Sequence, residues 1–486
     1  MAYKYILGVL MMKKKLLSII TSCIFAVASI APAQGISIVN AEETTAKSPI
    51  SGYTLLESKY EKPGEDSISV GVPGSYLAEQ QDALDRINEI RKEACDKGYP
   101  DPRDPKKKLS SSDYVPIKWS FALEEYARVR ACEASVYGEH TRPGTNEALV
   151  EGSDDENGYV SGTSETLAWP GNSLKGGVNL WYTEKDEWVS GGTGVTGHYT
   201  SMINPHNEYV GLGGFKSDFN MGNTNFNSCI CGRFSSTEWY SFPSTADELK
   251  RLKDETMAPE LKNIVQVISI NKSSVYKPNL SVLENDYAFI SNKGLYLGEK
   301  AVFAMVSKVK IDSDSASVID INEYTYSSSK PGILKVDADG KAETKNTGKV
   351  TVKAVNAGGK EYTLDMSITA FLSKPKVKLS STKKKKIKAK LTATKKDVVN
   401  MTYFEVQTAT DKKFTKNVKT TKVKTKVTSW YNPKTTFSKT IKGFKSKKKY
   451  YVRVRAVYEN KSYKNNDKSV IKVYSKWSSS KKIKVK

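Results

Sequence analysis

The sequence predicts a protein of the α+β class, in which a mixed helix-and-strand domain precedes two domains made of strands alone. Residues 78–243 have apolar positions at helical spacing and two short apolar runs typical of strands. Residues 265–372 and 373–486 alternate apolar and polar side chains between turn signals, as the strands of β-sandwiches do. All three histidines of the 486-residue chain fall within residues 78–243.

Residues 1–41 have the pattern of an export signal. A basic stretch at residues 13–15 precedes a mostly apolar run at residues 16–33, and small residues allow cleavage after Ala33 or Ala41. Two alternatives remain, a retained membrane anchor and a lipoprotein attached at Cys23. No later stretch approaches the ~20 apolar residues of a transmembrane helix. We therefore expect an extracellular, secreted protein, in which a cell-surface association is also open.

The elements of the first domain follow from periodicity and from start and stop signals. Residues 42–77 are polar and contain Gly and Pro, which predicts a linker. We expect helices from about Leu77 to Gly98, from Ser120 toward Gly138, and from about Leu174 to Val189. We expect strands at Tyr209–Phe215 and Ser228–Phe234, an acidic loop at Thr145–Gly162, a short ordered turn around Glu165, and a linker with a short helix at residues 244–264.

The histidines identify a candidate site. His198 opens the run GHYTSMINPHNEYVGLG, and His140 lies in GEHTRPGTN. Between them are SETLAW, with Glu165, and NLWYTEKDEW, with Glu184. A chain with so few histidines that places them in one segment, with acids and aromatics between, predicts one polar site there. The third histidine, His206, is expected in a surface loop.

These motifs resemble the secreted CAP superfamily of cysteine-rich secretory, antigen 5 and pathogenesis-related (SCP-like) proteins, with bacterial members the most similar. GHYT with the following YVGLG resembles the family signature, HTRP matches its first histidine, SETLAW resembles GENLAW, and WYTE matches its helix motif. The resemblance covers about residues 78–243 and implies an α-β-α sandwich. Ser201, Asn204 and the run SCICGRF depart from the family pattern, so activities of eukaryotic members do not transfer directly.

The resemblance implies a cleft tetrad of His140, Glu165, Glu184 and His198. Neutral imidazoles bind zinc, and a carboxylate beside each ring fixes its tautomer. With His140 and His198 as the only ligands, Zn²⁺ or another divalent cation would be weakly bound and exchangeable. Tyr199 and Trp181 are of residue types found more often in a core than in contact with a ligand, and of the two Tyr199 is the candidate to line the cleft. Two alternatives stay open: a purely structural polar cluster, and a metal-assisted hydrolase that uses the same tetrad with Glu184 as base.

The two strand-rich regions also resemble known modules. The run SSSKPGILKVDADGKAETKNTGKVTVKAV, within residues 265–372, resembles bacterial immunoglobulin-like domains of group 2. Residues 373–486 resemble a fibronectin type III module, in which Tyr450 stands at the tyrosine corner. Together with the export signal, these modules predict a Gram-positive-type extracellular protein with an adhesive or stalk-like C-terminal part.

The positive charge is concentrated in the last domain. Residues 373–486 contain 36 Lys and Arg against five Asp and Glu, a net charge of +31, whereas the whole chain has +23. This excess predicts association with an anionic polymer such as wall teichoic acids or host glycosaminoglycans, or with anionic lipids; export argues against nucleic acid. Lysines that only keep a β-sandwich soluble and shield its edges are the alternative.

Four cysteines remain after the signal, namely Cys95, Cys132, Cys229 and Cys231. Disulfide pairing and buried free thiols both stay open, whereas a thiolate zinc site lacks the usual spacing. The leading functional hypothesis is a non-enzymatic protein that binds a cation, a small ligand or a lipid in the tetrad cleft and uses the basic module for surface retention. A metal-assisted extracellular hydrolase and a plain adhesin with a structural tetrad are the alternatives.

Overall fold

The computed structural model describes residues 47–61, 63–144, 164–237, 246–283, 294–311, 315–425, 431–464 and 467–486. The chain divides into two compact units, Met1–Glu43 and Thr44–Lys486, and all described residues belong to the second. The predicted export signal, with Cys23, and the acidic loop at Thr145–Gly162 lie outside the described residues. No helix among the described residues has the length and apolar character needed to cross a bilayer.

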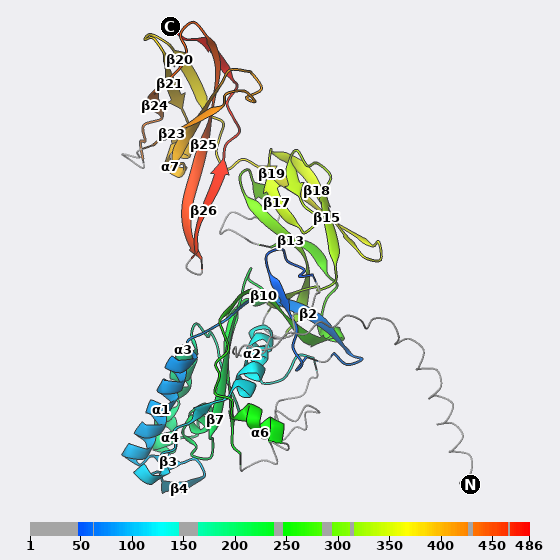
Figure 1. Ribbon diagram of the computed structural model, residues 1–486, viewed down its shortest axis with the longest axis vertical. Coiled ribbons are helices and arrows are strands. Elements are labelled where there is room, and N and C mark those ends of the chain that lie inside the picture. The colour runs from blue at the N-terminus through cyan, green and yellow to red at the C-terminus, as the bar shows by residue number, and fades with distance from the viewer. Residues whose placement is uncertain are drawn as a thin grey trace, which may run out of the picture. The chain divides into compact units, whose positions relative to one another are not determined.

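The first domain is built on strands β2, β7, β9 and β6, which lie in this order in one antiparallel sheet. Figure 1 shows α1 and α3 on one side of this sheet and α2 on the other. Helices α1, α3 and α5 share one apolar core with one face of the sheet, and α2 shares a second core with the other face. This arrangement is the predicted α-β-α sandwich. The bounds are β2 (Ser67–Tyr76), β6 (Ser164–Ala168), β7 (Tyr209–Ser217), β9 (Ser228–Ser235), α1 (Gln80–Lys97), α2 (Phe121–Val136), α3 (Leu174–Tyr182) and α5 (Gly197–Ile203).

Two predicted helices have the expected ends. α1 ends where Gly98 adopts a left-handed conformation with φ 61°, and its N–H bonds the carbonyls of the last turn. α2 begins after Ser120, whose side chain accepts a hydrogen bond from the N–H of Leu123. Short elements accompany them, namely β3 (Pro100–Asp101), β4 (Asp104–Lys108), β5 (Lys118–Trp119), a 3-10 turn at Ser111–Asp113, and β8 (Gly222–Asn223) in the connection between β7 and β9.

Two local predictions were wrong. The helix expected from Leu174 to Val189 is broken, because α3 ends at Tyr182 and α4 (Lys185–Ser190) follows. At the break the hydroxyl of Thr183 donates to the carbonyl of Leu180, a local bond that competes with a regular helix. The turn expected around Glu165 is instead strand β6, which pairs with β9 along its length.

Glycines in β7 allow α2 to lie unusually close to the sheet. A Cβ atom on Gly211 would stand 2.1 Å from the backbone nitrogen of Glu124, and one on Gly213 would stand 2.2 Å from the carbonyl carbon of Ala127. Both contacts involve helix backbone, so neither could be relieved by a side-chain rotation. The GLGG run therefore serves close helix–sheet packing.

The linker predicted at residues 42–77 was wrong. It contains β1 (Thr54–Leu56) and the ten-residue strand β2, whose residues are mostly buried. β2 pairs with β7 on one side and with β10 (Leu261–Asn271) on the other. β10 also begins inside the linker predicted at residues 244–264, after α6 (Ala246–Leu252). The sheet therefore continues across both predicted boundaries of the first domain.

Residues 265–372 form a β-sandwich. One sheet has the order β12-β19-β18-β15, and its apolar side chains share a core with β11, β13, β16 and β17 of the large sheet. The bounds are β11 (Asn279–Leu283), β12 (Gly294–Tyr296), β13 (Lys300–Lys310), β14 (Ser315–Ile319), β15 (Tyr324–Ser328), β16 (Leu334–Val336), β17 (Lys341–Thr344), β18 (Gly348–Asn356) and β19 (Glu361–Thr369), with a 3-10 turn at Lys272–Ser274.

The last domain is a second sandwich. A three-stranded sheet, β20-β21-β24, shares one core with a five-stranded sheet, β23-β22-β25-β26, in which β27 pairs with β25. The hydroxyl of Tyr450 accepts a hydrogen bond of 3.1 Å from the N–H of Lys445, which confirms the predicted tyrosine corner. The bounds are β20 (Lys376–Ser380), β21 (Lys386–Thr392), α7 (Lys395–Asn400), β22 (Tyr403–Ala409), β23 (Lys419–Lys424), β24 (Thr436–Lys442), β25 (Lys449–Lys464), β26 (Asp467–Tyr474) and β27 (Lys481–Lys484).

Candidate functional site

The first half of the candidate site is a pair of His140 and Glu165. His140 lies just beyond the end of α2, and Glu165 is the second residue of β6. The Nδ1 atom of His140 lies 2.9 Å from Oε1 of Glu165. The imidazole is 48% exposed, whereas the carboxylate is only 2% exposed. The ring therefore reaches solvent while its orientation is set by a buried acid.

Glu165 is fixed by two arginines that the sequence analysis did not identify. Arg130 of α2 bonds it with two nitrogens, at 2.9 and 3.1 Å, and Arg233 of β9 lies 3.2 Å away. Burial works to raise the pKa of the Glu165 carboxyl, but Arg130, the hydrogen bond with His140 and Arg233 outweigh it and hold this pKa well below its usual range. An ionised Glu165 accepts hydrogen bonds only, so Nδ1 of His140 must be the donor.

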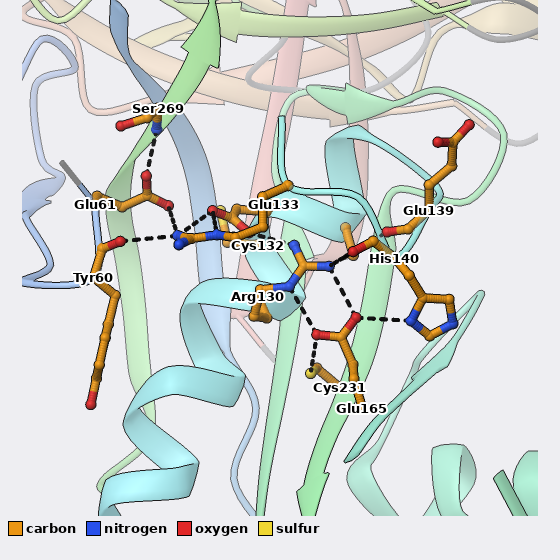
Figure 2. A network of polar contacts seen from close by, with 12 residues as sticks. Tyr60, Glu61, Arg130, Cys132, Glu133, Glu139, His140, Glu165, Cys231 and Ser269 are labelled. Atoms are coloured by element: carbon orange, nitrogen blue, oxygen red, sulfur yellow. Dashed lines mark hydrogen bonds and ion pairs between the residues drawn. The ribbon is translucent and has the colours of Figure 1, made fainter. Parts of the chain in front are cut away.

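Arg130 also connects this pair to a buried charge network (Figure 2). It bonds Glu133, one helical turn along α2, and approaches the backbone carbonyl of His140 at 3.4 Å. Glu133 in turn pairs with Arg142 at 2.8 Å. Burial opposes ionisation of Glu133, but Arg142 and Arg130 lower its pKa to about 2. The segment after α2 is thus held against the helix on both sides of His140.

Glu61 extends the network toward the N-terminal segment. Its carboxyl lies 3.5 Å from Arg142 and accepts a 2.7 Å hydrogen bond from the N–H of Ser269 in β10 (Figure 2). Burial and the neighbouring charge of Glu133 raise the pKa of Glu61 well above its usual range. The network therefore joins residues from the predicted linker, α2 and β10.

The second half of the site is a pair of His198 and Glu184. The Nδ1 atom of His198 lies 2.5 Å from Oε1 of Glu184, and the backbone N–H groups of His198 and Tyr199 donate to Oε2 at 3.0 and 3.1 Å. The break between α3 and α4 places Glu184 at the start of α5, where unpaired N–H groups favour a carboxylate. An ionised carboxylate only accepts hydrogen bonds, so with Glu184 ionised Nδ1 of His198 is the donor.

The two pairs lie side by side. The ring centres of His140 and His198 are 6.4 Å apart and their planes differ by 21°. The side chain of His198 is 23% exposed, and its other face lies 6.4 Å from the ring of the buried Trp181. With Nδ1 of each ring bonded to a carboxylate, the Nε2 atoms are the remaining nitrogens with a lone pair for a cation or a ligand proton.

The donor set suits a weakly bound metal ion. A metal-binding imidazole usually donates the N–H of its other ring nitrogen to a carboxylate or carbonyl, and in both pairs Nδ1 lies against a carboxylate. Within the described ranges, no group of three or more His, Cys, Asp and Glu side chains is arranged to bind one ion. His140 and His198 would therefore supply two ligands, fewer than the three or four protein ligands of tight zinc sites.

The remaining predicted residues differ in their placement. Of the two placements open for Tyr199, the structure has the core: its side chain is fully buried beside Tyr182, whose ring centre is 6.1 Å away, so Tyr199 does not line the site. A helical rotation of about 100° separates it from the exposed His198. His206 is half-buried in the turn after α5, and its N–H bonds the side chain of Asn204.

The four described cysteines are buried free thiols. Cys132, Cys229 and Cys231 lie in the core between α2 and the sheet. Burial raises the pKa of each of these three thiols, so they are protonated at neutral pH and act as apolar core residues. Of the alternatives left open by the sequence, the structure has buried free thiols.

Comparisons with known proteins give one family and several distant structures. Residues 84–230 match the model of the family described as CAP, the cysteine-rich secretory protein family. No curated protein matches the chain. Among solved structures, domains 4 and 5 of the S-layer protein SbsC share 16% identity over 42% of this chain and 98% of theirs, with a TM-score of 0.17. The FN1–FN3 domains of chicken CNTN1 share 12% identity over 57% of this chain and 95% of theirs, with a TM-score of 0.19. TM-scores this low assign no function.

Proposed function

We propose, from the premise that residues 84–230 form a CAP-family domain, that this protein is an extracellular binding protein without enzymatic activity. Its CAP domain binds a divalent cation, Zn²⁺ or one of similar chemistry, or a small ligand between His140 and His198. Its basic C-terminal domain retains it on an anionic surface polymer. One observation supports the proposal most strongly: two solvent-reaching imidazoles lie 6.4 Å apart, each oriented by its own carboxylate.

The roles of the four residues follow from their contacts. His140 and His198 would hold the cation through Nε2, while Glu165 and Glu184 each hold a proton-bearing Nδ1 and so keep the lone pair on Nε2. A bound cation would supply positive charge that attracts an anionic ligand group into the open coordination positions. Two ligands alone give a site that exchanges its metal readily.

The hydrolase alternative has no support in the geometry of Glu184. A general base needs a free carboxylate oxygen within reach of the water it deprotonates. Oε1 of Glu184 accepts from Nδ1 of His198, and Oε2 accepts two backbone N–H groups. The carboxylate is thus engaged in orienting His198 and the start of α5, which favours binding over hydrolysis.

Zinc titration of the full chain tests the proposal. Calorimetry should detect one weak site that is lost in His140→Ala and in His198→Ala. His206→Ala is the matched control, because it removes the third imidazole at a position outside the site and should leave binding unchanged. Equal zinc binding by the parent and all three variants would show that the site does not bind the metal. If the parent protein cleaved a peptide or an ester and His198→Ala did not, the result would instead support the hydrolase alternative.

Two observations support the extracellular surface location. Residues 1–41 have the pattern of an export signal, and residues 373–486 have a net charge of +31. A protein released across a membrane with such a domain would remain on nearby polyanions, with a strength that falls as salt rises. If residues 373–486, which form a sandwich with its own core, bound cells as well as the full chain does, adhesion without a role for the tetrad would be the better description.

A further inference from the structure

The outer face of the three-stranded sheet β20-β21-β24 is covered by lysines. Residues of β21 alternate, with Ile387, Ala389 and Leu391 buried in the core, so the residues between them point outward. The strand register places the outward residues of β20 and β24 beside them. We call this surface the lysine face; it consists of Lys376, Lys378, Lys386, Lys388, Lys390 and Lys442, with Ser380, Thr392, Thr436, Ser438 and Thr440 between them.

No acidic residue lies on any of the three strands of this sheet. The five acids of residues 373–486 are Asp397, Glu405, Asp411, Glu459 and Asp467. Glu405, Glu459 and Asp467 belong to strands of the other sheet, Asp397 belongs to α7, and Asp411 follows β22. The described ion pairs of the domain are Arg455–Glu405 and the pairs of Glu459 with Lys422 and Lys472, all on the five-stranded sheet. All acids on strands of this domain therefore belong to the five-stranded sheet, and the three-stranded sheet has none.

The positions of the lysines on this face lower the stability of the sheet. Lys378 stands directly opposite Lys390, and Lys386 stands directly opposite Lys442. Like charges in directly opposed positions destabilise a sheet. Protection of sheet edges does not account for them, because Lys386, Lys388 and Lys390 lie on β21, the central strand. A pattern that destabilises the sheet and that edge protection does not require indicates a partner of opposite charge.

The residue types indicate what that partner is. The face presents ammonium groups and hydroxyls and no guanidinium, so it offers point charges without the planar fork that Arg provides. The only arginines of the domain, Arg453 and Arg455, lie on the other sheet, stacked on Trp477 at 4.4 and 4.5 Å. Along a strand, outward residues repeat about every 6.6–6.8 Å. A row of lysines at this spacing can pair with the successive negative charges of a flexible chain that has one charge per repeat unit.

We propose that the lysine face is the docking surface for a linear phosphodiester polymer. This inference rests on the proposed retention of the protein by an anionic polymer, and it adds the location and the chemical class. The polymer lies across β20, β21 and β24, where its phosphates pair with the ammonium groups and its free hydroxyls can bond the serines and threonines. Its binding relieves the repulsion within the opposed lysine pairs.

Binding of synthetic poly(glycerol phosphate) to the full chain tests the proposal. The variant Lys378→Gln/Lys388→Gln/Lys390→Gln removes three charges from the face. The matched control, Lys412→Gln/Lys413→Gln/Lys416→Gln, removes three charges from the exposed turn after β22. We expect the face variant to bind on the order of 100-fold more weakly, which corresponds to roughly 1 kcal/mol per lysine, and the control to bind within a few fold of the parent. The slope of log K against log salt should fall by about two in the face variant, at roughly 0.7 per charge removed.

Thermal melting of the last domain gives a second, independent reading. The face variant should melt no lower than the parent, because the substitutions remove like-charge repulsion, yet added polymer should raise its melting temperature less than that of the parent. A face variant that melts at a lower temperature would contradict the cost assigned to the opposed lysines.

The outcomes separate the two proposals. If the face and control variants lose affinity equally, retention depends on total charge, and the lysine face is not the site although the proposed function stands. If the parent does not bind the polymer at all, polymer retention itself is wrong. Stronger binding to heparin would overturn the phosphodiester assignment. Stronger binding to vesicles of phosphatidylcholine with phosphatidylglycerol would show that the partner is a lipid surface, which would overturn the assignment to a linear polymer.

Discussion

Replacing Arg130 with methionine should destabilise the CAP domain by about 3 kcal/mol. The arginine side chain is fully buried, and its partners Glu133 and Glu165 are 1% and 2% exposed. Removing one member of a buried ion pair typically costs about 3–5 kcal/mol, because the remaining charge loses its partner. We expect the lower end of this range, since Glu165 keeps Arg233 at 3.2 Å and Glu133 keeps Arg142 at 2.8 Å.

Urea unfolding followed by tryptophan fluorescence measures this cost. The matched control is Arg251→Met, where the arginine pairs with Glu125 at 2.9 Å but the two side chains are 36% and 30% exposed. Exposed pairs contribute only about 0–1 kcal/mol, so the control should change stability little. If Arg130→Met cost no more than Arg251→Met, the buried network would not stabilise the segment around His140, and our account of that half of the site would be refuted.

Three further predictions test the fold. Gly213→Ala should cost at least about 1–3 kcal/mol in urea unfolding, because its Cβ would stand 2.2 Å from the backbone of α2, whereas Gly64→Ala, with open space at its Cβ, should cost little; equal costs would contradict close packing of α2. A fragment of residues 47–283, which contains β2, should unfold cooperatively. A fragment of residues 78–243 should not, because it lacks β2, and cooperative unfolding of this shorter fragment would show that β2 is dispensable. Tyr450→Phe should cost about 1 kcal/mol through loss of the hydrogen bond from Lys445, and Tyr431→Phe, at a side chain 97% exposed, should cost nothing measurable; no difference between them would count against the tyrosine corner.

Elements with regular periodicity and clear ends could be predicted from the sequence. Ser120 and Gly98 mark the ends of α2 and α1, and the apolar runs at Tyr209 and Ser228 mark β7 and β9. Strand β2 could not be predicted with the same rules. Its sequence SISVGVPGSY contains two glycines and a proline, which usually mark turns, and its burial depends on β7 and β10, strands about 140 and 195 residues further along the chain.

The four tetrad positions were predicted from motifs, but the residues that orient them were not. Arg130 and Arg233 reach Glu165 from 35 and 68 residues away, and no spacing rule connects them. The sequence of α2 did contain one indication of the buried network. Arg130 and Glu133 interrupt the inner face of a helix otherwise rich in Ala and Val. Charged residues at core positions need partners, so they indicate a network even where its members are unknown.

In the proposed site both imidazoles present Nε2 to one bound cation. Long-range ¹H–¹⁵N spectra of the full chain during zinc titration test it most directly, because they report the protonation of each ring nitrogen. We predict that His140 and His198 both have Nδ1–H and a free Nε2 before metal is added, and that both Nε2 signals shift together with one affinity. An Nε2–H tautomer in either ring, or a shift confined to one histidine at saturating zinc, would contradict the account.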